Sequence, residues 1–356
     1  MFCRPAAALL AVCIGGTAIA AEPATVDPAV AAQIAELQPY RPVSKIPDAT
    51  LRLWGHGSFK HDFMRKLVDA WAREFGRHHP GFRVDYRMYG TASAVGAVYT
   101  DAGDIALLGE EISPAAARAF KRAKGYRHTD VSVATGSLDI NFFDYAHMVF
   151  VHRDNPLSKL TLGQLRAVFA GDGCKGTVPA RAWGEVGVRG PLERARIQPY
   201  GWKTDVDFAL FFRERVLAGC HRWNPWMREF AHQKRAHPNQ YDHGQQIIDA
   251  VAEDPMGIAI SNIRYADDRV RAIALSYEDG GPWVEASQAS LVAQSYPLTR
   301  VIPAIIDHPP GQPIAALTRE FLRFLLSREG QQALLAHSGY LPLGPQIIES
   351  QLAKLQ

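Results

Sequence analysis

With 356 residues, of which 47% are hydrophobic, the chain is long enough to build two domains of ordinary size. Its formal net charge of +3 is not gathered into a basic block, and aromatic and basic residues are not interleaved, so the usual signature of a nucleic-acid-binding protein is missing. Beyond the N-terminal leader, no segment approaches the ~20 apolar residues of a membrane span. We therefore expect a soluble, monomeric mature chain.

The N-terminus predicts an export signal. Arg4 supplies a positive charge, residues 6–18 form an apolar run of small residues, and Ala18-Ile19-Ala20 is a typical cleavage signature. Residues 1–21 are therefore predicted to be a cleavable signal peptide, which would place the mature chain in the periplasm. A lipoprotein cleaved before Cys13 is the alternative.

Two of the four cysteines lie in this leader, and Cys174 and Cys220 remain in the mature chain. Export to an oxidising compartment favours a disulfide between them, which typically stabilises a fold by about 2–4 kcal/mol. Two free thiols are the alternative.

Secondary-structure patterns are weak directly after the leader and become clear from residue 51. Residues 22–50 are rich in Ala, Pro and Val without clear periodicity, and we expect a linker or a loosely packed N-terminal arm. An apolar strand is predicted at 51–55, followed by a Gly-x-Gly-Ser turn at 55–58 and a helix. The helix is indicated by apolar residues recurring every four positions, namely Phe59, Phe63, Leu67, Trp71 and Phe75.

Two further strands are expected at 82–89 and 104–109. The first ends in small and hydroxyl-bearing residues from Gly90 to Gly96, and the second leads to Glu110 and Glu111. Ser113 followed by Pro114 is typical of a helix start, because the serine side chain can cap the helix and proline fits its first position.

In the second half, a strand at 197–201 meets Gly201, then Thr204 and an apolar helical pattern from Phe208. This predicts a strand, a tight turn and a helix start. Since the first N–H groups of a helix have no partner inside it, such a turn can hold an anion. Other strands are expected at 147–152, 256–261, 270–275 and 298–306, the last with a proline that indicates an edge or irregular strand; a short helix from Thr161 and two C-terminal helices complete the set.

Strands alternate with helices along the chain, which predicts an α/β fold with mainly parallel sheets flanked by helices. In open α/β sheets, ligands bind beyond the carboxyl ends of the strands. The turns at 55–58, 90–96 and 201–204 each follow a strand in this way. We therefore expect them to face one cleft.

Several segments, taken in order, resemble one known family. They are Gly55-His56-Gly57-Ser58-Phe59, Gly90-Thr91-Ala92-Ser93, Asp104-Ile105-Ala106-Leu107, Leu160-Thr161-Leu162-Gly163-Gln164-Leu165, Trp183-Gly184-Glu185-Val186, Tyr296-Pro297-Leu298-Thr299-Arg300 and Gly339-Tyr340-Leu341-Pro342-Leu343. From about residue 51 to the C-terminus, the chain is similar to the periplasmic phosphate-binding proteins of ABC transporters, which are two-lobed (Venus-flytrap) substrate-binding proteins.

This resemblance implies a domain organisation and a partner. Lobe one would comprise residues 51–146 and 264–356, and lobe two residues 147–263. The crossings near 147–152 and 263–275 would form a hinge that closes on a small ligand such as phosphate or another oxyanion. The closed form would dock on an inner-membrane ABC permease or a sensor.

The resemblance also implies which residues contact the ligand. Lobe one would contribute Ser58, the backbone of Phe59, Thr91 and Ser93; lobe two would contribute Gly201, Trp202, Lys203 and Thr204; His56, Glu110 and Gln198 would support them.

At four positions the chain departs from the family pattern. Gln198 stands where the family has a phosphate-binding Arg, Trp202 replaces a Ser, and Lys203 replaces a Gly. Gly109 takes the place of an Asp that accepts a proton from the bound ion. A buried dianion needs charge-assisted donors, so inorganic phosphate is expected as ligand only if Lys203 replaces the missing Arg.

These residues also have structural explanations. Trp202 fits a residue that packs inside a lobe, and Lys203 fits a solvated side chain. Glu110 and Glu111 fit a pair at a helix N-terminus, where the helix dipole favours negative charge.

Catalytic and metal chemistry is not indicated. The 13 histidines include no H-E-x-x-H pair, and no two-cysteine zinc spacing exists. A Gly-x-Ser-x-Gly nucleophile elbow and a Walker-type phosphate loop are also missing. We expect no metal, no cofactor and no enzyme activity. The hypotheses are therefore a binding protein for uptake of phosphate or a related oxyanion, a binding protein for a different ligand in a sensory or scavenging role, and a periplasmic enzyme reusing the cleft.

Overall fold

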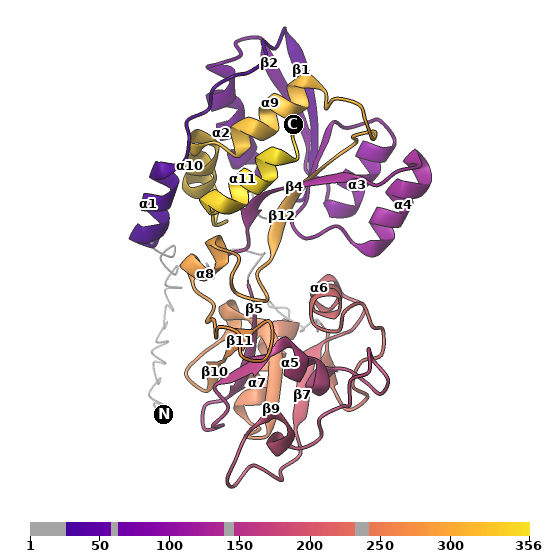
Figure 1. Cartoon of the computed structure of the whole chain (residues 1–356), viewed down its shortest axis with the longest axis vertical. Helices are drawn as coiled ribbons and strands as arrows, with labels where there is room; N and C mark the ends of the chain where they lie inside the picture. Colours follow the sequence, from indigo (N-terminus) through magenta and orange to yellow (C-terminus); the bar gives the residue numbers. More distant parts are fainter. Residues whose placement is uncertain (1–25, 58–62, 139–145, 232–241) are drawn as a thin grey trace, which may run out of the picture.

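The structure, a computed structural model, describes residues 26–57, 63–138, 146–231 and 242–356. The expected signal peptide and two of the expected ligand residues, Ser58 and Phe59, lie outside these ranges. The described chain forms two α/β units, stacked along the long axis of the molecule (Figure 1). This confirms the predicted fold class, and we call the units lobe one and lobe two.

Lobe one is built on a five-stranded sheet of order β2-β1-β3-β12-β4. β1 runs parallel to β2 and β3, whereas β12 is antiparallel to β3 and β4. The strands are β2 (Phe82–Arg87), β1 (Ala49–Gly55), β3 (Ile105–Leu107), β12 (Val301–Ile306) and β4 (Thr129–Thr135). Two groups of helices cover this sheet (Figure 1), one with α2 (Phe63–Gly76), α9 (Ala316–Leu325), α10 (Arg328–His337) and α11 (Pro345–Ala353), the other with α3 (Thr91–Tyr99) and α4 (Pro114–Lys124).

Lobe two has a second five-stranded sheet, of order β10-β5-β9-β7-β8. β7 is parallel to β8 and β9, and β5 is antiparallel to β9 and β10. Both sheets are therefore mixed, where the sequence predicted mainly parallel ones. The strands are β5 (His147–His152), β9 (Gly257–Asn262), β7 (Gln198–Trp202), β8 (Arg228–Phe230) and β10 (Val270–Ala272); the helices are α5 (Leu162–Phe169), α6 (Asp207–Arg215) and α7 (His243–Ala252), with short 3-10 turns at Trp183–Val186 and Ile263–Tyr265.

The chain returns to lobe one later than the sequence predicted. β10 pairs with β5, and β11 (Ala274–Ser276) pairs with β6 (Lys159–Thr161), so residues up to Ser276 belong to lobe two. The predicted boundary at 263/264 is therefore wrong. After Ser276 the chain passes through α8 (Gln288–Val292) and re-enters the first sheet at β12.

The N-terminal arm is packed more firmly than expected. Its helix α1 (Pro28–Glu36) buries Val30 and Ile34. The Tyr40 hydroxyl donates to the Glu320 carboxylate at 2.8 Å and lies 2.9 Å from His79 Nε2. Residues 28–46 are thus an integral part of lobe one. No sequence pattern indicated this, because the apolar residues that pack the arm are widely spaced among alanines and prolines and form no periodic pattern.

β12 is irregular, as its proline indicated, but it is not an edge strand. It lies between β3 and β4, and its register with β4 shifts between Ile302 and Pro303. A proline has no N–H to donate to a neighbouring strand. The bulge accommodates it, and the Pro303 carbonyl still accepts from Leu108 N at 2.9 Å.

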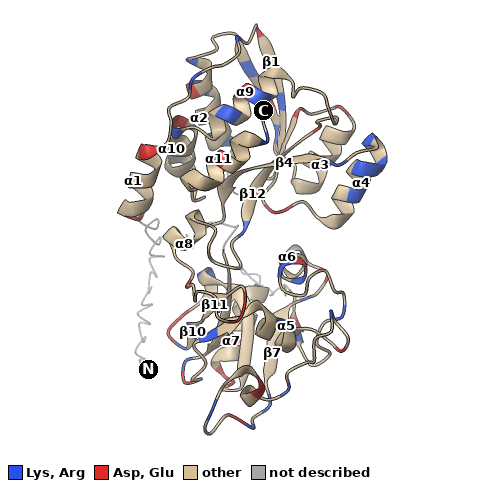
Figure 2. Ribbon diagram, viewed as in Figure 1, with Lys and Arg blue, Asp and Glu red and all other residues tan. Residues whose placement is uncertain are grey.

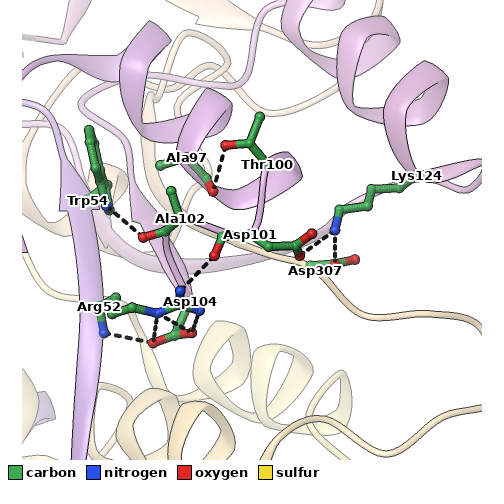
Figure 3. Close-up of polar contacts among 9 residues, drawn as sticks. All are labelled: Arg52, Trp54, Ala97, Thr100, Asp101, Ala102, Asp104, Lys124 and Asp307. Atoms are coloured by element: carbon green, nitrogen blue, oxygen red, sulfur yellow. Dashed lines mark hydrogen bonds and ion pairs between the residues drawn. The ribbon is translucent and has the colours of Figure 1, made fainter.

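A polar network fastens the turn between α3 and β3, at the amino end of β3 (Figure 3). Asp101 has a left-handed φ of 61°, and its carboxylate forms an ion pair with Lys124 Nζ at 2.6 Å. Lys124 also pairs with Asp307 at 2.9 Å. Next to them, Arg52 binds the Asp104 carboxylate at 2.6 Å. These contacts hold α3, and therefore its N-terminus, against the sheet.

Helix starts follow the expected capping chemistry. Ser113 Oγ accepts from Ala116 N at the start of α4, and Thr161 forms a capping box with Gln164 at the start of α5. Cys174 and Cys220 are joined in a disulfide, with their Cα atoms 5.9 Å apart. Within the described ranges, no helix is both long and apolar enough to cross a bilayer.

Candidate functional site

Three loops of lobe one meet at the carboxyl ends of β1, β2 and β3. The Gly55 carbonyl accepts from Gly90 N at 3.1 Å, and His56 N donates to the Leu107 carbonyl at 2.9 Å. The structure therefore brings the first two glycine/hydroxyl turns together with the loop that begins at Leu108. The topology rule for open α/β sheets predicted this convergence.

His56 is held by its neighbours inside this group of loops. Its Nε2 lies 3.0 Å from the Tyr340 hydroxyl, and its ring rests on Gly109. A Cβ at Gly109 would be only 2.7 Å from His56 Nδ1. The family pattern has an Asp at this position. Here the glycine provides the space that the His56 ring fills.

The hydroxyl side chains at the start of α3 are directed partly toward the protein itself. Gly90, the N-cap, has a φ of 118°, which favours glycine. Ser93 Oγ donates to the Gly90 carbonyl at 2.8 Å, so this hydroxyl proton is directed at the protein. Thr91 is half-buried at the first helical position. Contact of Thr91 and Ser93 with a ligand stays a prediction.

The β7–α6 connection differs from the turn expected at Gly201. β7 continues through Gly201 and Trp202, and the turn is formed by residues 203–206 before α6 begins at Asp207. Gly201 is buried in the sheet, where a Cβ would approach Met227 Sδ to 3.0 Å and Ile260 Cγ1 to 3.3 Å. The glycine is thus explained by close packing rather than by a turn.

Trp202 lies in the interior of lobe two. Its side chain is fully buried, and its ring centroid lies 4.8 Å from that of His147 and 5.3 Å from that of Phe208. This placement agrees with the packing explanation for Trp202.

The polar groups of the lobe-two turn already have partners within the protein. Lys203 Nζ pairs with Asp205 at 2.8 Å, and both side chains are largely exposed. Thr204 donates from its backbone N to Glu229 Oε2 at 3.2 Å and from its hydroxyl to Glu229 Oε1 at 3.4 Å. The carboxylate of Glu229 therefore already accepts from both donors of Thr204, which were expected to reach a ligand.

Gln198 lies at the opposite end of β7 from this turn. Its side-chain amide donates to the carbonyls of Pro199 and Trp226, at 3.0 and 2.9 Å. It braces the loop that carries Trp226.

Arg300, to which the sequence assigned no role, contacts both lobes. Its side chain is only 2% exposed. Nε and Nη2 donate to Glu111 Oε2 at 3.2 and 3.1 Å, and Nη2 lies 3.5 Å from Glu110 Oε2. On the lobe-two side, the guanidinium lies 5.0 Å from the Phe211 ring centroid. Both glutamates thus belong to an ion cluster, and not merely to a helix start.

A cavity of about 470 Å³ opens beside Arg300, between the lobes. One wall is the lobe-one segment 110–114, which leads into α4 and carries acidic residues opposite α6 (Figure 2). The other wall is α6, through Leu210, Phe211, Glu214 and Arg215. The lobes therefore face each other across a cavity with a guanidinium at its base and both apolar and charged walls.

Behind Arg300, His147 is completely buried at the start of β5. Neither of its ring nitrogens has a hydrogen-bond partner among the described residues. Burial, reinforced by the positive charge of Arg300, lowers the pKa of His147 well below its ordinary value. The ring is thus neutral at neutral pH and contributes no positive charge to the cavity.

No local pattern in the sequence marked Arg300 as a buried residue between the lobes. Its partner Glu111 lies 189 positions earlier in the chain, and no local pattern pairs residues that far apart.

Among the described residues, no group of three His, Cys, Asp or Glu side chains could hold a metal ion.

Comparison with known proteins agrees with this architecture. A family model described as a PBP superfamily domain matches residues 61–329. The phosphate-binding protein PstS of Pseudomonas aeruginosa is 26% identical over 295 residues, which cover 83% of this chain and 84% of that protein.

One solved structure supports the same fold, and a second matches at a lower TM-score. PstS from Borrelia burgdorferi superposes with a TM-score of 0.53 at 10% identity, covering 83% of this chain and 98% of that one. An ABC-type phosphate transport receptor from Vibrio cholerae gives a TM-score of 0.49 at 16% identity, covering 82% and 99% of the two chains. The family match spans well over half of the sequence, and the chain belongs to the PBP superfamily, as a two-lobed binding protein rather than an enzyme.

Proposed function

We propose that this chain is a periplasmic solute-binding protein that holds a small oxyanion, such as phosphate or a related ion, in the cavity between segment 110–114 and α6. The observation that carries the proposal is the position of Arg300. This buried guanidinium touches carboxylates of lobe one and aromatic rings of lobe two, so an anion bound there contacts both lobes at once.

Binding would proceed by exchange of partners. The side chains of Glu110 and Glu111 remain 25% and 32% exposed, so either carboxylate can return to water when an entering anion takes its place on Arg300. An anion that accepts two N–H bonds from a guanidinium is bound with defined geometry. Closure of the lobes would then be a population shift favoured by contacts made on both sides.

The names of the relatives support an oxyanion, whereas two features of this chain favour a larger organic acid as the second candidate. The turn that would hold phosphate in lobe two is occupied by Glu229. The cavity also has apolar walls formed by Ile112, Pro114, Leu210 and Phe211, which suit a carbon skeleton better than a bare ion.

Export and partnership belong to the same proposal. The predicted signal peptide and the Cys174–Cys220 disulfide both suit an oxidising compartment outside the cytoplasm. An ABC permease of the inner membrane, or a sensor, would receive the loaded protein.

Thermal denaturation with a panel of phosphate, sulfate, molybdate, phosphonates and small organic acids tests the proposal. A solute that binds only the native state raises the melting temperature. We expect one class of anion to do so, and Arg300→Gln to abolish the shift. Arg118→Gln, which removes an exposed guanidinium from α4, should leave the shift unchanged.

Glu111→Gln keeps the experiment informative if Arg300→Gln fails to fold. Because the variant side chain competes less well for Arg300, anion affinity should stay equal or rise. A panel in which no anion changes the melting temperature, or a loss of binding in Arg118→Gln equal to that in Arg300→Gln, would contradict the proposal.

A further inference from the structure

A second charged feature lies at the other end of lobe two. Arg181, Arg194, Arg196 and Trp226 line a depression of about 360 Å³ on the surface. We call these four residues the Arg–Trp patch. All three arginines are exposed, and Trp226 is 43% exposed.

Two of the guanidiniums are ordered by the indole. The Arg196 guanidinium lies 4.9 Å from the centroid of the Trp226 ring, and the Arg181 guanidinium lies 5.1 Å from it. Such cation–π contacts contribute about 0.5–1 kcal/mol each at exposed sites. They hold the arginines beside the ring, so that their N–H groups stay available to a third group.

The scaffold beneath the patch is firmly built. Ala182 and Arg196 form an antiparallel bridge, and Ile197 N donates to the Arg181 carbonyl at 2.9 Å. The Trp226 carbonyl accepts from the Gln198 side chain at 2.9 Å, and Trp226 N donates to Asn224 Oδ1 at 2.9 Å. The patch is therefore presented in a defined shape, which reduces the entropy lost on binding.

The positive charge of the patch is not neutralised locally. Within the described ranges, no ion pair joins Arg181, Arg194 or Arg196 to a carboxylate. The neighbouring Glu185 accepts from the backbone N of Arg181 at 2.9 Å, and Glu193 pairs with Arg189 at 3.8 Å. Three like charges around one depression repel each other, and an anionic group bound there would relieve this repulsion.

We infer that the Arg–Trp patch is a docking site for a carboxylate-rich segment of a partner protein. Arginine and tryptophan are among the residue types enriched at the binding hot spots of protein interfaces, and a guanidinium matches a carboxylate in a bidentate geometry. The patch is concave, so a protruding acidic side chain can enter it, whereas contact with a lipid surface would require a protruding apolar group.

The position of the patch separates it from the cavity between the lobes. Gln198 braces Trp226 at the amino end of β7, whereas Trp202, at the carboxyl end, lies on the side of the cavity. Four residue steps along a strand are roughly 13 Å. Basic residues lie on loops of lobe two on the side away from lobe one (Figure 2), so a partner could dock there with the cleft still free to open and close.

Fluorescence anisotropy with a labelled hexaglutamate peptide tests this inference on the full mature chain. We expect the peptide to bind in a salt-dependent way and a hexaglutamine peptide not to bind. The double substitution Arg181→Gln/Arg196→Gln should weaken binding about tenfold or more, since two charge-assisted pairs are lost. The matched control is Arg118→Gln/Arg122→Gln, which removes two exposed charges from α4 and should leave the affinity unchanged.

A third variant separates a shaped site from a simple accumulation of charge. Trp226→Leu keeps every arginine but removes the ring that orders two of them, and it should also weaken binding. Equal losses in the α4 control and the patch variant, or full affinity in Trp226→Leu, would overturn the inference. Binding to vesicles of anionic phosphatidylglycerol without binding to hexaglutamate would do the same and would assign the patch to a membrane surface. Circular dichroism confirms that each variant is folded.

Discussion

The two lobes differ in how their strand ends and turns are built near the cavity between them. On the lobe-one side, three loops are joined by backbone hydrogen bonds and by glycines that allow close approach, as at Gly109 against His56. On the lobe-two side, the turn at 203–206 has the donors of Thr204 occupied by Glu229 and its lysine paired with Asp205. Lobe two faces the cavity with a helix side, through Phe211, rather than with a helix start.

Under the proposed function, this difference assigns anion binding to Arg300 rather than to a helix start. A helix start offers partial positive charge that water and a nearby carboxylate can screen. A buried guanidinium carries a full charge in a drier environment. Arg300 now shares that charge with Glu111 and Glu110, and an anion that displaces them would interact with it more strongly than with a helix start. Arg300 is 2% exposed, whereas Lys203 is 53% exposed, so recognition by this chain is expected to depend on Arg300.

The largest effect on stability is expected from a substitution in the lobe-one loops. Gly109→Ala would place a Cβ 2.7–3.1 Å from three atoms of the His56 ring. Overpacking of this kind typically costs about 1–3 kcal/mol. We expect a loss of that size in the free energy of unfolding, measured by urea denaturation, together with weaker solute binding because the loops shift.

The matched control for Gly109→Ala removes the group with which it collides. In Gly109→Ala combined with His56→Ala, most of the destabilisation caused by Gly109→Ala should disappear relative to His56→Ala alone. Additive effects of the two substitutions would show that His56 and Gly109 do not depend on each other, and that the lobe-one loops tolerate more change than their packing indicates.

The second prediction concerns the acid stability of the lobe-two interior. A buried neutral histidine binds a proton less readily than in the unfolded chain, because burial and Arg300 lower the pKa of His147. The unfolded state therefore takes up protons first as pH falls below about 6.5, and stability decreases, by at most about 1.4 kcal/mol per pH unit for one proton.

His147→Phe should remove this part of the acid sensitivity. Phenylalanine fits the aromatic surroundings of Trp202 and Phe211 and has no unsatisfied nitrogen. Between pH 7.5 and pH 5, we expect the variant to lose about 1–2 kcal/mol less unfolding free energy than the natural chain. Burial also lowers the pKa of His79 and of His128, so a smaller acid effect persists. Parallel losses in both proteins would show that His147 is accessible to protons in the fold.

The sequence predicted the elements better than it predicted their neighbours. The Ser113 cap, the short helix beginning next to Thr161 and the strands expected near residues 51–55, 82–89 and 104–109 depend on local chemistry, and each was found, whereas β4 and α7 were not predicted. β12 lies in the centre of its sheet although Pro303 indicated an edge, because a bulge between two strands can absorb a missing N–H. Such a bulge depends on β4, which is remote in sequence.

The candidate site could be predicted only in part, again because many of its contacts join segments that are distant in the sequence. The convergence of the lobe-one loops follows from topology, which alternation of strands and helices reveals. The Arg300–Glu111 pair, the occupation of the Thr204 donors by Glu229, and the burial of Trp202 all depend on contacts between distant segments. Motif position alone marked Trp202 and Lys203 as ligand residues, and it cannot reveal which donors the protein has already used.

The smallest effect is expected at the residue that the family pattern made most important. If Lys203 replaced the missing arginine of phosphate-binding relatives, Lys203→Ala would abolish anion binding. Because Lys203 is exposed and paired with Asp205, and exposed ion pairs contribute little, we expect its removal to change solute affinity by less than about twofold.

Calorimetric titration of Lys203→Ala beside Arg300→Gln and Glu111→Gln, with the solute that stabilises the natural chain, measures this difference directly. A large loss in Lys203→Ala with retained binding in Arg300→Gln would reverse the roles of the two lobes. It would mean that lobe closure carries Lys203 and Thr204 away from Asp205 and Glu229 and onto the solute, and the lobe-two turn would then be the anion site after all.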